Sequence, residues 1–129
     1  AAARLTYAFA NATVPKVNVV LGSAMGTAGI ALHSTAVGAD LVFAWPQAQI
    51  GSMEGKLAAK IMYEGQGADV INEKAAQYDA LQVSAQSAAR RGYVDRIVEA
   101  ADTRKYVISA FEMLFTKSED RPVKKHGTV

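Results

Sequence analysis

The segment best suited to chemistry is a short apolar run followed by glycines and alanines. Residues 17–21 are rich in β-branched side chains, and Gly22, Gly26 and Gly29 follow them. This order predicts a buried strand, a glycine-rich turn and the start of a helix. The first N–H groups of a helix have no partner inside it, so they can hold a phosphate or the oxyanion of an acyl or enolate intermediate.

A purely structural explanation fits the same segment, because small side chains let a helix pack closely on a strand. The sequence leaves both explanations open. The spacing of Gly22, Gly26 and Gly29 is not that of the G-x-G-x-x-G dinucleotide fingerprint. A P-loop is excluded as well, because no Gly-Lys-Ser/Thr follows the glycines.

Few other side chains predict chemistry. The absence of cysteine excludes a disulfide framework, thiolate metal sites and a cysteine nucleophile. His33 and His126 lie far apart, so we expect no metal site, and Glu54 and Glu64 form no acid/base pair. Trp45, which precedes Pro46 at the end of an apolar run, could form a pocket rim, although core packing is the commoner explanation.

Composition and length describe one ordinary domain or a piece of a larger one. The chain has 129 residues, 50% of them hydrophobic and 20% charged, which excludes a disordered chain. A net charge of +2 is too small to indicate a nucleic acid or an anionic membrane as partner. The most apolar stretch, residues 36–45, falls short of the roughly 20 residues that a membrane span needs. With no cysteine and no export signal, we expect a cytoplasmic protein.

Charge is distributed very unevenly along the chain. The first 53 residues contain only Arg4, Lys16 and Asp40 as charged residues, and all the others follow later. Because roughly a quarter of a protein surface is normally charged, we expect another subunit, or another part of the same protein, to cover this half. The chain begins with Ala1 rather than methionine, so we also expect a cut or processed start.

Strand and helix patterns alternate along the chain, which predicts α/β layers. The expected helices cover residues 5–12, 30–37 and 103–117, and a longer helical pattern runs from 54 to 92 with interruptions at Gly65 and Gly67. The expected strands cover residues 17–21, 41–45, 49–53 and 96–98. Residues 121–129 are polar and contain Pro122, so we expect them to be irregular.

Several segments, read in order, resemble one protein family. They are residues 7–17, 25–28, 38–40, 44–46 with Ile50, 91–95, 102–104 and 122–127. Together they resemble the C-terminal part of the biotin-dependent acyl-CoA carboxyltransferases. That family includes the propionyl-CoA carboxylase beta chains, methylmalonyl-CoA carboxyltransferase and the methylmalonyl-CoA and glutaconyl-CoA decarboxylase alpha subunits.

The resemblance implies a crotonase-like fold, a spiral of strand–strand–helix units, of which residues 1–129 would form a single partial domain. It implies an active site between the N-terminal domain of one subunit and the C-terminal domain of its partner. The expected partners are therefore an N-terminal carboxyltransferase half and the biotin carboxyl carrier protein, in a homo- or hetero-oligomer. No nucleic acid and no membrane insertion are expected, although the decarboxylase relatives would allow attachment to a membrane complex.

The resemblance also implies the site residues. The family's Tyr-Gly-Gly-Ala turn supplies N–H donors to the anionic ureido oxygen of biotin. Its second Gly and its Ala fall on Thr27 and Ala28, with Gly26 as the hinge. These residues would form a backbone oxyanion hole with no metal, and each donor in such a site is worth about 3 kcal/mol.

Substrate-binding roles are expected at Met25, Ile30, Trp45 and Met53. Met25 replaces the family's aromatic residue, and Ile30 aligns beside the acyl pocket, where an apolar residue suits an aliphatic acyl group. The family's Met-Gly becomes Met53-Glu54 and its Asn-Pro becomes Ser84-Ala85. The acyl group and the direction of the reaction stay undetermined.

The implied function is that of a carboxyltransferase component acting on biotin and an acyl-CoA, inactive without the N-terminal half. Two alternatives stay open: a crotonase-type acyl-CoA hydratase or isomerase, and a non-catalytic assembly subunit of a carboxyltransferase complex. Against the hydratase, no suitably placed pair of glutamates is evident.

Overall fold

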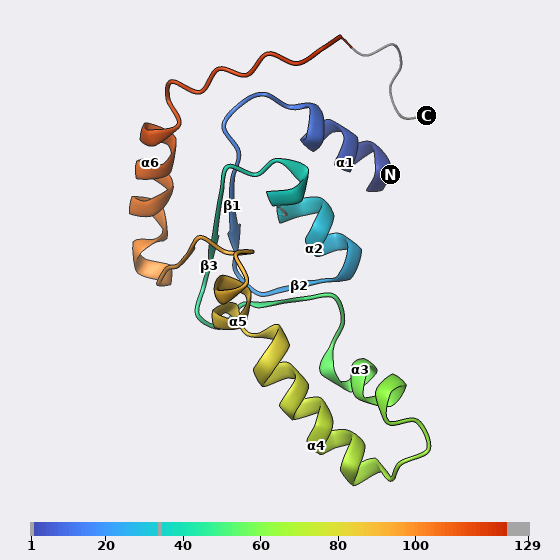
Figure 1. Ribbon diagram of the computed structural model, residues 1–129. Coiled ribbons are helices and arrows are strands. Elements are labelled where there is room, and N and C mark those ends of the chain that lie inside the picture. The colour runs from blue at the N-terminus through green and yellow to red at the C-terminus, as the bar shows by residue number, and fades with distance from the viewer. Residues whose placement is uncertain (1, 34, 124–129) are drawn as a thin grey trace.

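The chain folds into two consecutive strand–strand–helix units followed by further helices (Figure 1). The computed structural model describes residues 2–33 and 35–123. Helix α1 (Ala2–Asn11) precedes the first unit, which comprises β1 (Val17–Val20), β2 (Ser23–Met25) and α2 (Gly26–His33). The second unit comprises β3 (Leu41–Ala44), β4 (Gln49–Gly51) and α3 (Gly55–Met62). The α/β prediction and the strand–strand–helix repeat are confirmed.

The two strands of each unit belong to different sheets. Strands β1, β3 and β5 (Arg96–Ile97) form one parallel sheet in that order, and β2 and β4 form a second parallel sheet. Val17 lies opposite Leu41 in the first sheet, and Ser23 lies opposite Gln49 in the second. Each unit therefore stacks on its equivalent, which is how a spiral is built.

Strand β3 lies between two hydrophobic clusters because its side chains alternate between the faces of the sheet. Val42 and Ala44, both fully buried, belong to a cluster with Val20, Ala48, Ile50, Ala85, Ala88 and Val94. On the opposite face, Phe43 packs with Val98 and with Ala110 of helix α6 (Thr103–Met113), which covers that side of the sheet (Figure 1). These two clusters fix the position of β1 and β2, and so of the helix that follows them.

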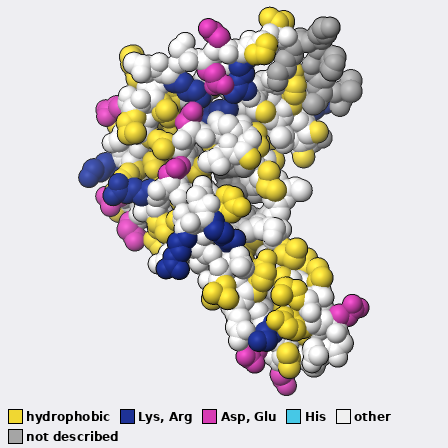
Figure 2. Space-filling model, viewed as in Figure 1, with side chains coloured by type: hydrophobic (Ala, Val, Ile, Leu, Met, Phe, Trp, Pro, Cys, Tyr) yellow, Lys and Arg dark blue, Asp and Glu magenta, His cyan; other side chains and the backbone are white. Residues whose placement is uncertain are grey.

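Helices α3 and α4 (Ala68–Tyr78) form a hairpin that extends away from the sheets (Figure 1). Their close approach depends on Gly55, whose N–H donates to Asp79 Oδ1 over 2.8 Å. Figure 2 shows hydrophobic side chains gathered on this hairpin; the large exposed ones are Leu57, Ile61, Met62 and Val70. This surface has no partner within the described part of the chain.

The prediction of one helical pattern from residue 68 to Gly92 was wrong, because the chain turns at Ser84. Helix α4 continues as a π-helix (Asp79–Val83), and a new helix, α5 (Ala85–Arg90), follows. Ser84 has an extended backbone, with ψ of 149°, and its Oγ accepts the N–H of Ser87 over 3.2 Å. The apolar spacing continues across this N-cap, so periodicity alone did not reveal the break.

The expected glycine-rich turn at residues 22–29 contains a strand that the sequence analysis missed. Ser23–Met25 forms β2 because β4, more than 20 residues later, offers it a parallel partner. Helix α2 consequently begins at Gly26 and ends at His33, so the helix expected over 30–37 was displaced; Thr35–Val37 is a 3₁₀ turn. Because β2 forms only through this distant pairing, Ser23, Ala24 and Met25 carry no local pattern that predicts a strand.

Asp40 joins the loop before β3 to the segment after α6. Its carboxylate accepts the N–H of Lys16 over 2.7 Å and the Lys117 Nζ over 2.8 Å. Burial alone would raise the pKa of the Asp40 carboxyl, but these hydrogen bonds and the charges of Lys117 and Lys16 lower the pKa below its ordinary value. The ionised carboxylate therefore stabilises the fold.

We expect Asp40→Asn to lower the free energy of unfolding by about 2 kcal/mol at pH 7, because it removes the closer of the two carboxylates that pair with the partly buried Lys117 ammonium group and leaves only Glu119 at 3.7 Å. Since the folded pKa is lowered, this stabilisation is complete above the ordinary aspartate pKa of about 4 and is lost as pH falls through the folded pKa. Thermal unfolding from pH 7 to pH 2 should thus show the two proteins converging. Asp120→Asn, at an exposed position, is the control; a constant difference at all pH values would contradict the assignment.

Candidate functional site

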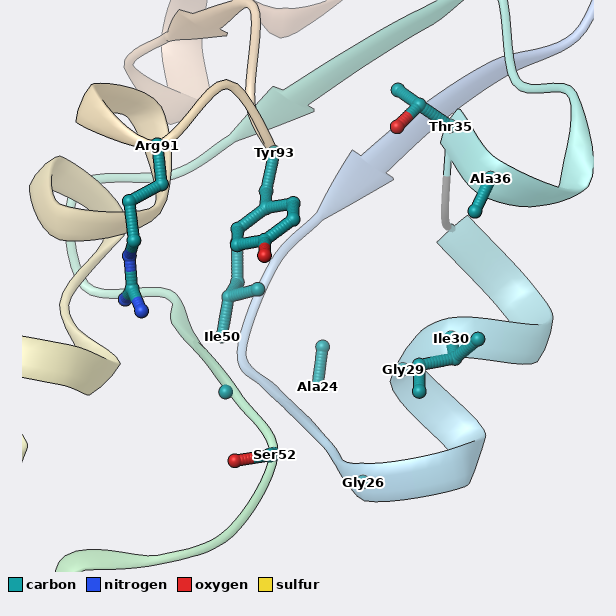
Figure 3. Close-up of a pocket in the computed structure, with 11 residues that line it drawn as sticks. Ala24, Gly26, Gly29, Ile30, Thr35, Ala36, Ile50, Ser52, Arg91 and Tyr93 are labelled. Atoms are coloured by element: carbon teal, nitrogen blue, oxygen red, sulfur yellow. The ribbon is translucent and has the colours of Figure 1, made fainter.

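A cavity of about 370 Å³ lies beside the beginning of helix α2 (Figure 3). The second sheet contributes one wall through β2 and β4, α2 contributes another, and the loop after α5 contributes the third. The lining residues are Ala24, Gly26, Gly29, Ile30, Thr35, Ala36, Ile50, Gly51, Ser52, Arg91 and Tyr93. Most of the lining is therefore small or apolar, with a few polar side chains at the edges.

Helix α2 begins beside this cavity with a residue that has to be glycine. Gly26 has a φ of +60°, a value that side chains disfavour, and this conformation turns the strand β2 directly into the helix. Thr27 and Ala28 occupy the next two helical positions and are exposed. Their N–H groups have no hydrogen-bond acceptor among the described residues, as expected for a first helical turn. The predicted backbone donors are therefore available to a ligand.

A second hollow, of about 250 Å³, lies on the other side of the first turn of α2. It is lined by residues 18–24 together with Ala28 and Gly29. Gly29 borders both hollows, so the first turn of α2 separates them. A ligand in either hollow would lie near the positive end of the helix dipole.

The structure brings some of the predicted site residues together. Gly26 and Ile30 line the larger cavity, Ala28 lines the smaller hollow, and Thr27 lies between Gly26 and Ala28 at the start of α2. Met25 ends strand β2 immediately before them, opposite Gly51 of β4. Gly26, Thr27, Ala28 and Ile30 thus all lie at the start of α2, but Gly26 and Ile30 border the larger cavity, Ala28 borders the smaller hollow, and Thr27 is not among the described lining of either.

Three predicted substrate residues, Met25, Trp45 and Met53, do not line the larger cavity. Trp45 packs in the cluster around Phe43, and its indole N–H donates to Thr103 Oγ1 over 2.9 Å. The structure therefore supports the packing explanation for Trp45. Met53 is half-buried beyond the end of β4 and does not line the described cavity either. The substrate-binding role of Met53 stays a prediction.

Arg91 and Tyr93, which have no site role predicted from the sequence, both lie across the cavity from α2 (Figure 3). They flank Gly92 in sequence, and the φ of +78° at Gly92 forms the turn that follows α5. The signal was the Arg-Gly-Tyr sequence itself, in which a glycine between two large polar residues indicates a tight turn presenting both. Their position in space, however, depends on the pairing of β3 with β5.

The described lining suits hydrogen bonding more than proton transfer. No carboxylate or imidazole lines the described cavity, which offers the hydroxyls of Thr35, Ser52 and Tyr93. Within residues 2–33 and 35–123 no group of three or more His, Cys, Asp or Glu residues could hold a metal ion. His126 and the side chain of His33 lie outside the described part of the chain. No described helix is long and apolar enough to cross a membrane.

Comparison with known proteins gives matches along the whole chain. The family model described as "Carboxyl transferase domain" matches residues 1–129. The chain is 44% identical to the putative propionyl-CoA carboxylase beta chain of Bacillus subtilis, with 98% of this chain and 26% of the relative covered. It is 41% identical to the methylmalonyl-CoA carboxyltransferase 12S subunit of Propionibacterium freudenreichii, with 97% and 25% covered. The chain thus spans about a quarter of the length of these curated relatives.

Solved structures agree with these sequence matches. The transcarboxylase 12S crystal structure superposes on 98% of this chain and 25% of its own with a TM-score of 0.92, at 41% identity. The beta subunit of Pseudomonas aeruginosa geranyl-CoA carboxylase, at 24% identity, shares the fold with a TM-score of 0.77. The crotonase-like fold is confirmed by these neighbours. With a matching family model over every residue and a shared fold, the chain belongs to the carboxyl transferase domain family.

Proposed function

We propose that this chain takes part in transferring a carboxyl group between biotin on a carrier protein and an acyl-CoA, and that it contributes the biotin-side oxyanion hole. One observation carries the proposal: α2 opens with two N–H groups that have no acceptor in the described structure, in a first helical turn that borders two hollows through Gly26, Ala28 and Gly29. The relatives named as propionyl-CoA carboxylase and methylmalonyl-CoA carboxyltransferase support the same reaction class.

Biotin, when bound, would carry the carboxyl group on its ureido ring, whose oxygen can bear negative charge. The N–H groups of Thr27 and Ala28 stabilise this negative charge as it develops. A donor fixed by the backbone needs no reorganisation during the reaction, which is why each can contribute about 3 kcal/mol. Threonine in place of the family's glycine is compatible with this role, because no described residue other than glycine has a positive φ.

The cavity also fits the proposed reactants. Its volume of about 370 Å³ falls within the range of roughly 300–1,000 Å³ that is common for small-molecule sites. Ile30, Ala24 and Ile50 give it an apolar lining suited to an aliphatic acyl group. Ser52 and Thr35 add hydroxyl groups at its border. This combination favours a short acyl chain with a few polar atoms.

Surfaces left uncovered in this chain support the proposed partners, an N-terminal carboxyltransferase half and further subunits. Strands β1 and β2 both lie at the edge of their sheets, where further strands of a spiral can pair. Several large apolar side chains of the first 53 residues are exposed, namely Leu5, Val14, Leu21 and Ile30. The similar 12S subunit is described as assembling into a hexamer. The biotin carrier protein and a cytoplasmic location remain proposals from the sequence.

The decisive experiment combines this chain with all the remaining part of a matching carboxyltransferase and measures carboxyl transfer from carboxybiotin to acyl-CoAs. We expect transfer that requires biotin and both parts. Hydration of an enoyl-CoA without biotin would instead indicate the crotonase-type hydratase. Stable assembly without either activity would indicate a subunit with a role in assembly only, and would contradict the proposal.

A further inference from the structure

The wall of the larger cavity across from α2 carries its two strongest hydrogen-bond donors, Arg91 and Tyr93 (Figure 3). The guanidinium of Arg91 is already committed to the protein. Its Nη1 donates to Gln82 Oε1 over 2.8 Å, its Nε to the Ser87 carbonyl over 3.2 Å, and its Nη2 to Ser87 Oγ over 3.1 Å and to the Gln82 carbonyl. Arg91 therefore joins the π-helix to α5, and it has little hydrogen-bonding capacity left for a ligand.

The hydroxyl group of Tyr93, unlike the Arg91 guanidinium, has hydrogen-bonding capacity left for a ligand. The Tyr93 side chain points from the loop after α5 into the cavity (Figure 3), and the residue is 57% exposed. No described residue forms a hydrogen bond with its hydroxyl group. The Tyr93 N–H donates to the Ala88 carbonyl over 3.0 Å, and the Arg91 guanidinium lies 5.8 Å from the ring centre. A ring held in this way presents a free donor at a fixed place.

The surroundings of Tyr93 indicate what its hydroxyl group would bind. Ala24 and Ile50 line the same cavity, so a carboxylate entering it would lose water without gaining partners from these residues. The acyl end of a carboxylated acyl-CoA is hydrocarbon and thioester apart from one carboxylate. That carboxylate would need a donor on the wall of the cavity, and Tyr93 supplies one next to the positive charge of Arg91.

We propose that Tyr93 is a positioning residue whose hydroxyl group donates a hydrogen bond to the transferable carboxylate of the acyl-CoA. The inference rests on the proposed function, because it assigns the cavity to the acyl end of the substrate. It gives Tyr93 a role in distinguishing a carboxylated acyl-CoA from the same acyl-CoA without its carboxyl group. Arg91 supports this role by holding the ring rather than by contacting the ligand.

The test compares Tyr93→Phe with the unaltered protein in the assembled carboxyltransferase, by calorimetric titration with methylmalonyl-CoA and with propionyl-CoA. Phenylalanine keeps the ring and removes only the hydroxyl group. We expect affinity for methylmalonyl-CoA to fall about tenfold or more, as for a lost hydrogen bond to a charged group. Affinity for propionyl-CoA, which lacks the carboxylate, should stay within twofold.

Tyr63→Phe, the same change on the α3–α4 hairpin, is the matched control and should alter neither affinity. Equal affinities of Tyr93→Phe and the unaltered protein for methylmalonyl-CoA would overturn the role of Tyr93. An equal loss for both ligands would overturn it as well, because the hydroxyl group would then not read the carboxylate. Because binding is measured without biotin, an enzyme that binds as expected but transfers no carboxyl group would refute the proposed function alone.

Discussion

Replacing Thr27 with proline is expected to reduce carboxyl-transfer turnover by about 10²–10³-fold, because proline lacks the N–H that stabilises the developing anion. The substitution is possible structurally because Thr27 is the second residue of α2 and its N–H has no acceptor within the helix. Proline is tolerated in the first turn of a helix for this reason. Turnover and the Michaelis constant for acyl-CoA, measured on the assembled enzyme, should show a loss confined to turnover.

Thr27→Ala is the matched control for this prediction. It removes the hydroxyl and methyl groups but keeps the N–H, so we expect turnover close to that of the unaltered enzyme. Thermal unfolding of both variants should confirm that the fold is retained. If alanine is as harmful as proline, the side chain rather than the backbone donor matters; if neither reduces turnover, α2 does not form the oxyanion hole.

The second large effect is expected on stability, at Gly55. A Cβ atom at this position would lie 2.5 Å from Asp79 Oδ1 and closer still to the carbonyl oxygen of Ala75. Because Ala75 lies in α4 and Asp79 at its junction with the π-helix, Gly55→Ala must push the two helices of the hairpin apart. We expect it to lower the free energy of unfolding by about 3 kcal/mol, in the upper range for overpacking. Thermal unfolding should show a decrease of roughly 10 °C.

Gly67 provides the control within the same hairpin. It precedes α4 with an ordinary φ of −64°, and nothing lies within 4 Å of a Cβ atom placed there. Gly67→Ala should therefore leave stability unchanged or raise it slightly, since it restricts only the unfolded chain. Equal effects of the two substitutions would contradict the close approach of α3 and α4 at Gly55.

Sequence reasoning located the elements whose signals are local. The β-branched run predicted β1, and Pro46 bounded the apolar run of β3, whereas the helix expected from residue 30 begins at Gly26. The assignment of Thr27 and Ala28 as backbone donors came from the family resemblance, because the glycines alone left an anion site and close packing both open. Strand β2 was not predicted because its three residues acquire their conformation by pairing with β4. The end of α4 was not predicted because the apolar periodicity continues through Ser84.

Only part of the candidate site could be predicted from the sequence, for the same reason. Gly26, Thr27, Ala28 and Ile30 are close in sequence, so a family motif covers them all. Tyr93 reaches the cavity only because β5 pairs with β3 and α5 packs under the sheet, which depends on contacts between distant residues. Trp45 illustrates the reverse case: a residue that the sequence associated with a pocket is held instead by Thr103, far along the chain.

The order of the strands has a consequence for how this polypeptide matures on the ribosome. Strand β3 is made more than 20 residues after its neighbour β1, β5 more than 50 residues after β3, and Lys117, the partner of Asp40, later still. Such distant parallel pairings form slowly. The nascent chain therefore leaves one edge of the hydrophobic strand β3 unpaired while more than 50 further residues are made, and chaperone depletion during translation should lower the yield of soluble protein more than it does after release.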